Sequence, residues 1–106
     1  MKAIEKLIGK KVIIRSDRAG VFFGTLNEVE SVGDKYTVEL TECRRIWYWS
    51  GAASLSQLAM EGVKDANSCK FTVVVNEIVI AGVVEIIPCS DEAVQNINSV
   101  SVWKKR

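Results

Sequence analysis

The chain has 106 residues, of which 48% are apolar and 25% are charged, and its formal net charge is +1. These values predict one ordinary globular domain over residues 1–106 with a single hydrophobic core. They exclude a molecule-wide field that draws the protein to nucleic acid or membrane. The sequence has no histidine, which removes the commonest general acid or base and the commonest metal ligand.

The cysteines and the apolar runs of the sequence favour a cytoplasmic location. Cys43, Cys69 and Cys89 are odd in number, widely spaced and without a Cys-x-x-Cys pair, which favours buried thiols in a reducing setting over a disulfide or zinc site. Apolar runs such as Phe71–Val75 are too short to span a bilayer, and residues 1–9 lack the apolar stretch of a secretory signal. We therefore expect a cytoplasmic protein with no metal, cofactor or membrane contact.

The N-terminal half predicts short antiparallel strands. Residues 4–8 have the apolar spacing of one helical turn. Gly24 lies inside a predicted strand, where glycine indicates a bulge or a sharp bend. Three short strands with such a bend favour a small, strongly bent, SH3-like antiparallel barrel. The strands are predicted at residues 11–15, 21–30 and 36–40.

The alternation of apolar and polar residues breaks after Leu40. Continued in register, it would bury Glu42 and Arg44, so we predict a bulge near Thr41–Cys43. Residues 44–49 then either continue the strand or form an extended arm.

A short helix is inserted after this segment. Ser54 followed by Gln57 is a capping-box pattern, and Gly62 is a suitable C-cap. The helix is predicted over residues 55–61.

The remaining chain predicts further strands and a C-terminal helix. Gly82 should bend the chain between strands. Ser90 should cap a final helix that runs to about Val102. The expected class is therefore α+β and mostly β, a barrel with one inserted short helix and a C-terminal helix. The further strands are predicted at residues 71–75, 78–80 and 83–87.

Catalytic motifs are missing from the sequence. The serines have no histidine to activate them, the carboxylates form no obvious pair, and neither glycine-rich phosphate-binding motif is present. We therefore expect a protein that is not an enzyme.

The stretch Arg44–Leu58 combines groups that bind nucleotides. Arginine pairs with phosphate, aromatic rings stack on bases, and the free N–H groups at a helix start hold anions. The candidate ligand-binding residues are Arg44, Arg45, Trp47, Tyr48, Trp49, Ser50, Gly51, Ser54 and Gln57.

The aromatic residues of this stretch also compete for the core. Adjacent aromatics are costly to leave wholly in solvent, so at least one should be buried. We expect Ile46 and Tyr48 to point inward. Arg45, Trp47 and Trp49 should then face a ligand or partner.

Other candidates have ordinary structural explanations. Helix capping by itself would explain Ser54 and Gln57. Trp103, beside three basic residues, is either a nucleic-acid contact or a plug at a helix end or exposed tail.

Three blocks of the sequence carry a resemblance. They are G-K-K-V-I-I-R from Gly9, A-G-V-F-F-G-T-L from Ala19, and R-R-I-W-Y-W-S-G-A-A-S-L-S-Q-L-A from Arg44. From Gly9 to Pro88 the chain resembles small phage-encoded or prophage-encoded domains of about this length, and W-Y-W-S-G-A-A-S-L is the most specific block. It also looks like the viral sponges that sequester cyclic-nucleotide signals of bacterial immunity, the anti-CBASS and anti-Thoeris proteins. This resemblance implies a homo-oligomer that holds its ligand between subunits without cleaving it.

The leading hypothesis is a phage immune-evasion protein that binds and sequesters a cyclic nucleotide. Trp47 or Trp49 would stack on a base and Arg45 would pair with a phosphate. Backbone groups around Gly51–Ser54 would hold another oxygen.

Two alternatives remain open. The first is an SH3-like nucleic-acid-binding module that uses the basic ends, Lys10, Lys11 and Lys104–Arg106, although the near-neutral net charge argues against it. The second is a protein-interaction module with an exposed W-Y-W patch, since tryptophan, tyrosine and arginine are enriched at interface hot spots.

Overall fold

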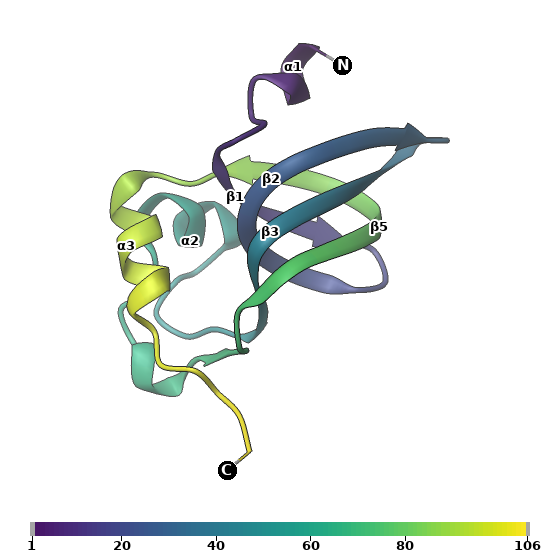
Figure 1. The fold of residues 1–106 in the computed structure, drawn as a ribbon. Coiled ribbons are helices and arrows are strands. Elements are labelled where there is room, and N and C mark those ends of the chain that lie inside the picture. The colour runs from purple at the N-terminus through teal and green to yellow at the C-terminus, as the bar shows by residue number, and fades with distance from the viewer. Residues whose placement is uncertain (1, 106) are drawn as a thin grey trace.

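The computed structural model of the chain describes residues 2–105. Five strands and three α-helices form a mostly β, α+β fold, as the sequence predicts (Figure 1). A 3-10 turn, η1, precedes the short fourth strand. The elements are α1 (Lys2–Glu5), β1 (Lys11–Ser16), β2 (Gly20–Val32), β3 (Lys35–Tyr48), α2 (Leu55–Glu61), η1 (Ala66–Ser68), β4 (Lys70–Phe71), β5 (Val75–Pro88) and α3 (Asp91–Ser99).

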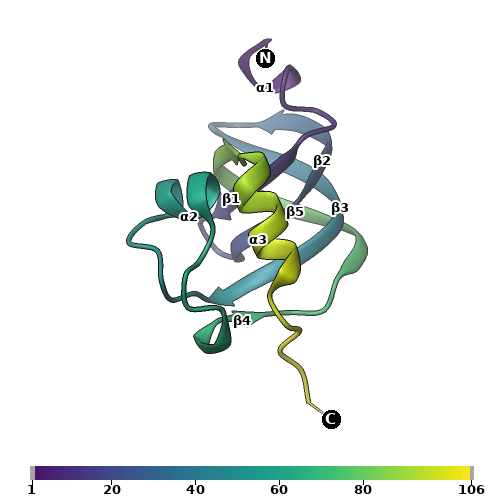
Figure 2. The same cartoon turned by 90° about the vertical axis from the view of Figure 1, so that its left-hand side faces the viewer.

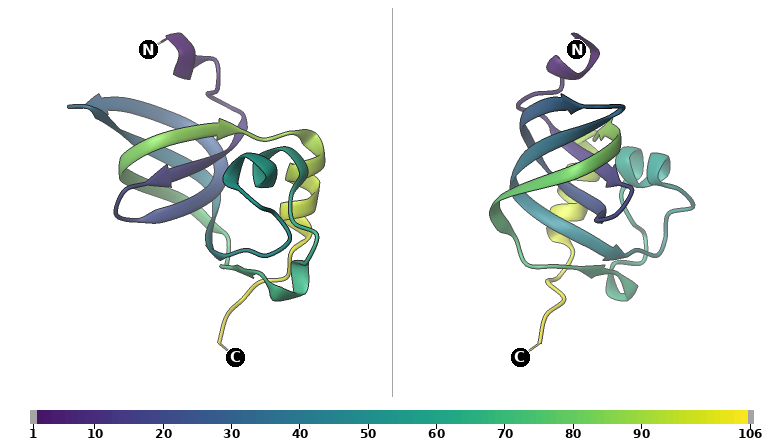
Figure 3. Two further views of the ribbon diagram at one scale, coloured as in Figure 1. Left: turned by 180° about the vertical axis from the view of Figure 1, so that it is seen from behind. Right: turned by 90° about the vertical axis from the view of Figure 1, so that its right-hand side faces the viewer.

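Four strands pair in a closed ring. β1 pairs with β2 and β5, and β3 also pairs with β2 and β5, always antiparallel. The fifth strand, β4, extends the end of β3. Helix α3 runs across one side of the sheet with α2 beside it (Figure 2), and the strands lie together to one side of the two helices (Figure 3, left).

Two clusters of buried side chains replace the single core that the length predicts. Val12, Ile13 and Ile14 are all fully buried, because the strand is covered on both faces. Ile13 belongs to the cluster under α2 and α3, together with Phe23, Ile46 and other side chains. Val12 and Ile14 belong to the second cluster, on the other face of the same strands. Each strand of the ring therefore contributes to both clusters.

The predicted bulge lies at the expected place. Phe23 pairs with Arg44 but Thr25 pairs with Thr41, so β3 has an extra residue opposite Gly24. A Cβ at Gly24 would lie 3.0 Å from the carbonyl oxygen of Thr41, which explains why glycine occupies this position. The bulge is confirmed, and residues 44–48 continue β3 rather than forming a separate arm.

The two later helices begin where the sequence predicts. Helix α2 has the predicted bounds, with the Ser54 hydroxyl accepting a hydrogen bond from the Gln57 N–H. Ser90 caps α3 by accepting from the Ala93 N–H. However, α3 ends at Ser99, about one turn before the predicted end, because its last carbonyls bind a side chain from β3.

The predicted strands after residue 70 differ from the structure. The strand predicted over residues 71–75 is wrong in its extent, since β4 comprises Lys70–Phe71. The Thr72 carbonyl accepts a hydrogen bond from the Arg44 side chain instead of continuing the ladder along β3. The two predicted strands that follow are one long strand, β5, bent at Gly82, which has a φ of 68°.

Candidate functional site

A second bulge, where β3 meets β4, directs Trp47 into solvent. Ile46 pairs with Phe71 and Tyr48 pairs with Lys70, so Trp47 is the extra residue. A bulge shifts the alternation of side chains by one position. Trp47 and Tyr48 are consequently both exposed, at 63% and 51%. The expectation that Tyr48 points inward is therefore wrong, while Ile46 is buried as expected.

Trp103 reaches the same place from the C-terminal tail. Beyond α3, Val102 forms a parallel bridge with Phe71 of β4, and the Trp103 N–H donates to the Phe71 carbonyl at 2.8 Å. The tail thus passes alongside β4, as Figure 2 shows. Trp103 itself remains 46% exposed.

Trp47 and Trp103 form a parallel pair, called here the indole pair. Their ring centroids are 6.4 Å apart and their planes differ by 10°. The Lys70 ammonium lies 5.4 Å from the centroid of the Trp103 ring. Two exposed indoles beside a lysine therefore offer flat apolar faces and a positive charge together.

Trp103 also lines two hollows in the surface. One, of about 280 Å³, lies between the tail and the η1 region and includes Asn67 and Ser101. The other, of about 460 Å³, is lined by Trp103, Lys104 and Lys105. The indole pair is thus flanked by open space and by two further lysines.

Arg44, a predicted ligand-binding residue, is buried and fully engaged by the protein. Its side chain has five N–H donors, and they point at five backbone carbonyls. The residue is 3% exposed. None of the ion pairs among residues 2–105 includes it. The accepting carbonyls are those of Thr72, Ile97, Val100, Phe71 and Ser101, at 2.9–3.4 Å.

Burial also affects the acid–base chemistry of Arg44. Removal from water lowers the pKa of its guanidinium group below the usual range. The carbonyls at the C-terminal end of α3 compensate, because they carry the negative end of the helix dipole. Arg44 therefore has no donor left for a phosphate, and its role is structural.

The Arg45 side chain points to the opposite face of β3 from that of Arg44, because side chains alternate along a strand. Its guanidinium carbon lies 4.7 Å from the centroid of the Phe22 ring. It lines an apolar hollow of about 250 Å³ with Val73 and Val75. The side chain is exposed, so it retains the capacity to bind an anion.

The turn after the aromatics packs against another loop. Ser50 donates through its hydroxyl to the Asp65 carboxylate at 3.1 Å. A Cβ at Gly51 would lie 2.5 Å from the backbone nitrogen of Asp65 and 2.6 Å from that of Lys64. The close approach that Gly51 permits is thus made by the protein's own chain.

The backbone N–H groups at the start of α2 are also bound by side chains of the protein itself. The Gln57 side-chain oxygen accepts from the Ala53 N–H at 2.6 Å, and Ser54 accepts from the Gln57 N–H at 3.1 Å. These two bonds use N–H groups that the predicted phosphate cradle requires. The capping role of Ser54 and Gln57 is confirmed.

Trp49 differs from Trp47 in its surroundings. It is partly buried and packs against the cluster beneath the helices. The shift of alternation at Trp47 explains this, because it turns Trp49 back toward the protein. The structure therefore brings Trp47 to the exposed indole pair but commits Trp49 largely to packing.

Two of the three cysteine thiols, those of Cys43 and Cys89, are unsuited to nucleophilic chemistry. Burial raises the pKa of Cys43 and of Cys89 to about 12. Both thiols are thus protonated at neutral pH, whereas reactive cysteines have a lowered pKa.

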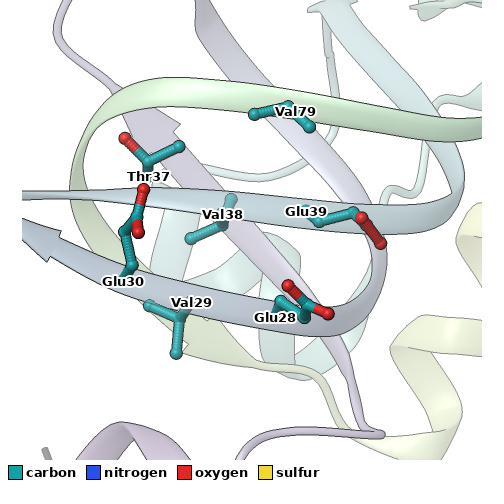
Figure 4. A pocket seen from close by; sticks show the side chains of 7 residues that line it. All are labelled: Glu28, Val29, Glu30, Thr37, Val38, Glu39 and Val79. Atoms are coloured by element: carbon teal, nitrogen blue, oxygen red, sulfur yellow. The ribbon is translucent and has the colours of Figure 1, made fainter.

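A further hollow, of about 230 Å³, lies on the β2–β3 hairpin (Figure 4). Glu28 and Glu39 lie opposite each other across the two strands. Glu30 and Val79 also line it. No aromatic or basic side chain lines this acidic hollow among the described residues, so it lacks the groups that bind a nucleotide.

Two residues at the indole pair, Lys70 and Trp103, were not among the ligand-binding residues predicted from the sequence. Lys70 meets Trp103 because the C-terminal tail pairs with β4, and this pairing has no local signal in the sequence. Trp103 stands beside basic residues in the sequence, which was the available signal, but its partner was not predictable. Arg106, the last of these basic residues, lies outside the described residues.

None of the helices among residues 2–105 is long and apolar enough to cross a membrane.

Comparisons with known proteins give a family but no activity. No curated protein and no solved structure matches the chain. Residues 9–97 match a family model described as a domain of unknown function, DUF6948. This match covers most of the chain and includes Trp47 and Lys70, and the chain therefore belongs to the DUF6948 family.

Proposed function

We propose that this protein is a non-catalytic module that binds a nucleotide, with a base stacked on the indole pair and a phosphate near Lys70. The observation that carries the proposal is the pair itself, two exposed parallel indoles with an ammonium group 5.4 Å from one ring. Stacking of a base on an aromatic side chain is worth about 1–3 kcal/mol, whatever the base.

The proposal moves the ligand away from most of the residues that the sequence favours. Arg44, Ser54 and Gln57 have their donors or acceptors engaged within the chain. Trp47 remains in the site, and Trp103 takes the place expected for Trp49. Lys70 takes the part expected for Arg45 because it is the cation that lies against the pair.

The role that we propose is sequestration of a cyclic-nucleotide signal by a phage-encoded, SH3-like module. The resemblance of the chain to small phage-encoded domains and to viral sponges supports this role. A sequestering protein needs slow release and a pre-organised site, and parallel indoles held by backbone pairing provide pre-organisation.

The proposal is tested by thermal melting against a panel of cyclic mono-, di- and trinucleotides. A binding nucleotide at 100 times its Kd adds about 2.7 kcal/mol to the stability of the fold and raises the Tm measurably. The matching linear nucleotides serve as controls that test whether binding requires the cyclic form of the nucleotide. No shift with any cyclic nucleotide at millimolar concentration would refute the sequestration role.

Single-stranded nucleic acid is the second candidate, and Lys104 and Lys105 favour it. They continue the positive charge of Lys70 beyond Trp103, where the next phosphate of a strand would lie. Lys11 is engaged by other residues, since its ammonium group lies 3.8 Å from the Glu42 carboxylate and 5.7 Å from the centroid of the Phe23 ring. Two results together would favour this candidate. A short oligonucleotide should bind with an affinity that falls steeply as the salt concentration rises, and a mononucleotide should not bind.

We also propose that the protein assembles as a homo-oligomer. Val73, Val74, Val75 and Val79 are exposed by 40–67%, which concentrates apolar surface beside β5. Size-exclusion chromatography with light scattering tests this directly. The 260/280 nm absorbance ratio of the same sample reports any nucleotide that copurifies.

A further inference from the structure

The C-terminal tail brings Trp103 to the indole pair, and nearly half of the surface of its two apolar side chains stays in solvent. Val102 and Trp103 are 44% and 46% exposed. The tail contacts β4 through one bridge and one backbone hydrogen bond. Apolar burial therefore restrains the tail only in part, because nearly half of each of these side chains remains exposed.

Arg44 supplies the missing constraint. One of its terminal nitrogens, Nη1, donates to the carbonyls of Ile97 and Val100, both at 2.9 Å. The other, Nη2, donates to the Ser101 carbonyl at 3.4 Å and to the Phe71 carbonyl at 3.3 Å. One guanidinium group thus joins the end of α3, the first residue of the tail and the strand alongside which the tail lies.

The geometry suits arginine and no other residue. The five donors are coplanar, and they reach carbonyls from three segments of the chain at once. Hydrogen bonds from a charged donor are about twice as strong as neutral ones, and burial strengthens them further. Lysine has three donors on a tetrahedral nitrogen, so it cannot satisfy the same five carbonyls.

We propose that Arg44 is the positioning residue of the nucleotide site: it fixes the end of α3 and the start of the tail so that Trp103 lies parallel to Trp47. The inference rests on the proposed function for what the pair binds, but the positioning is measurable without a ligand. Arg44 touches no ligand in this account and acts through Trp103.

The test compares Arg44→Lys with Arg45→Lys, a change at the neighbouring arginine, whose guanidinium group lies against the Phe22 ring. The first readout is the exciton couplet in circular dichroism that two close parallel indoles produce, with Trp103→Ala as the reference for its loss. The second is amide hydrogen exchange at Trp103, normalised to the Gly62 N–H that closes α2. The third is the affinity for the nucleotide that gives the largest melting shift.

Arg44→Lys should lose the couplet and increase exchange at Trp103 by about tenfold or more while Gly62 stays protected. Its affinity should fall as far as that of Trp103→Ala, and Arg45→Lys should retain the couplet and the exchange pattern. If Arg44→Lys keeps the couplet and a protected Trp103 amide, the proposal is overturned. If no nucleotide binds the unmodified protein, the proposed function fails, but the couplet and the exchange data still decide the role of Arg44.

Arg44→Lys is also expected to lower the stability of the fold. If it unfolds, the measurements are repeated in trimethylamine N-oxide, which favours the compact state without replacing the lost contacts. A variant that does not fold even then would overturn the proposal, because Arg44 would support the whole fold and not the tail.

Discussion

The acidic hollow on the β2–β3 hairpin and the hollows beside the indole pair differ in the chemistry of the side chains that line them. The first has a volume of about 230 Å³, and the other two have volumes of about 280 and 460 Å³. Glu28 and Glu39 give the first a negative surface. Trp103, Lys104 and Lys105 give the larger tail hollow an aromatic and positive surface. A phosphate is repelled by one region and attracted by the other, so volume alone does not locate a site.

The two regions also differ in how their backbones are held. The hairpin ends in a free turn at Gly33, where an added Cβ would meet nothing within 4 Å. The chain leading from Trp47 to α2 packs tightly at Gly51 against the loop before β4. The turn at Gly51 is therefore closely packed, whereas the turn at Gly33 is open.

The largest expected effect comes from Gly51→Ala. Gly51 has a φ of 89°, and its Cβ would collide with the backbone at Lys64 and Asp65. We expect a loss of about 3 kcal/mol or more in the free energy of unfolding, measured with urea. The matched control is Gly33→Ala, which has a φ of 65° and open space, and should cost about 1 kcal/mol. Equal losses would show that the two turns do not differ as described.

A smaller effect is expected on affinity from Lys70→Met. The change removes the ammonium near Trp103 but keeps an unbranched apolar side chain. Nucleotide affinity should fall about three- to tenfold in dilute buffer, and less at high salt, because an exposed charge pair is screened. Lys64→Met, at another exposed lysine, should leave affinity unchanged. Equal losses from both variants would indicate a general effect of net charge.

The smallest effect concerns the acidic hollow. Glu28→Gln removes one of two like charges that lie opposite each other in the sheet. Stability should rise by about 0.2–1 kcal/mol at low salt, and nucleotide affinity should not change. The control is Glu77→Gln. Glu77 lies on β5 opposite the uncharged Thr41 of β3, so this change should not stabilise the fold. A marked change in nucleotide affinity in Glu28→Gln would place the ligand on the hairpin instead.

Features with a local cause were predictable from the sequence. Ser54, Gln57 and Gly62 define α2, because capping depends on residues within one turn. The bulge opposite Gly24 was visible because β3 would otherwise bury Glu42. The mostly β class follows from the same short-range patterns.

Features with a distant cause were not predictable in the same way. The early end of α3 depends on Arg44, which lies more than fifty residues away in the chain. The exposure of Tyr48 depends on the bulge at Trp47, and that bulge is set by the pairing with β4. The indole pair itself joins β3 to the tail. Local composition therefore suggested candidate residues, whereas the tertiary contacts determine which of them lie together.

The measurement that tests the central claim most directly is calorimetric titration of Trp47→Ala with the cyclic nucleotide that best stabilises the unmodified protein. Trp49→Phe is the control, since Trp49 packs against the buried cluster and lies outside the indole pair. The loss of one stacking contact, about 1–3 kcal/mol, predicts an affinity lower by roughly 5- to 150-fold in Trp47→Ala and unchanged in Trp49→Phe. Unchanged binding by a folded Trp47→Ala variant would contradict the account.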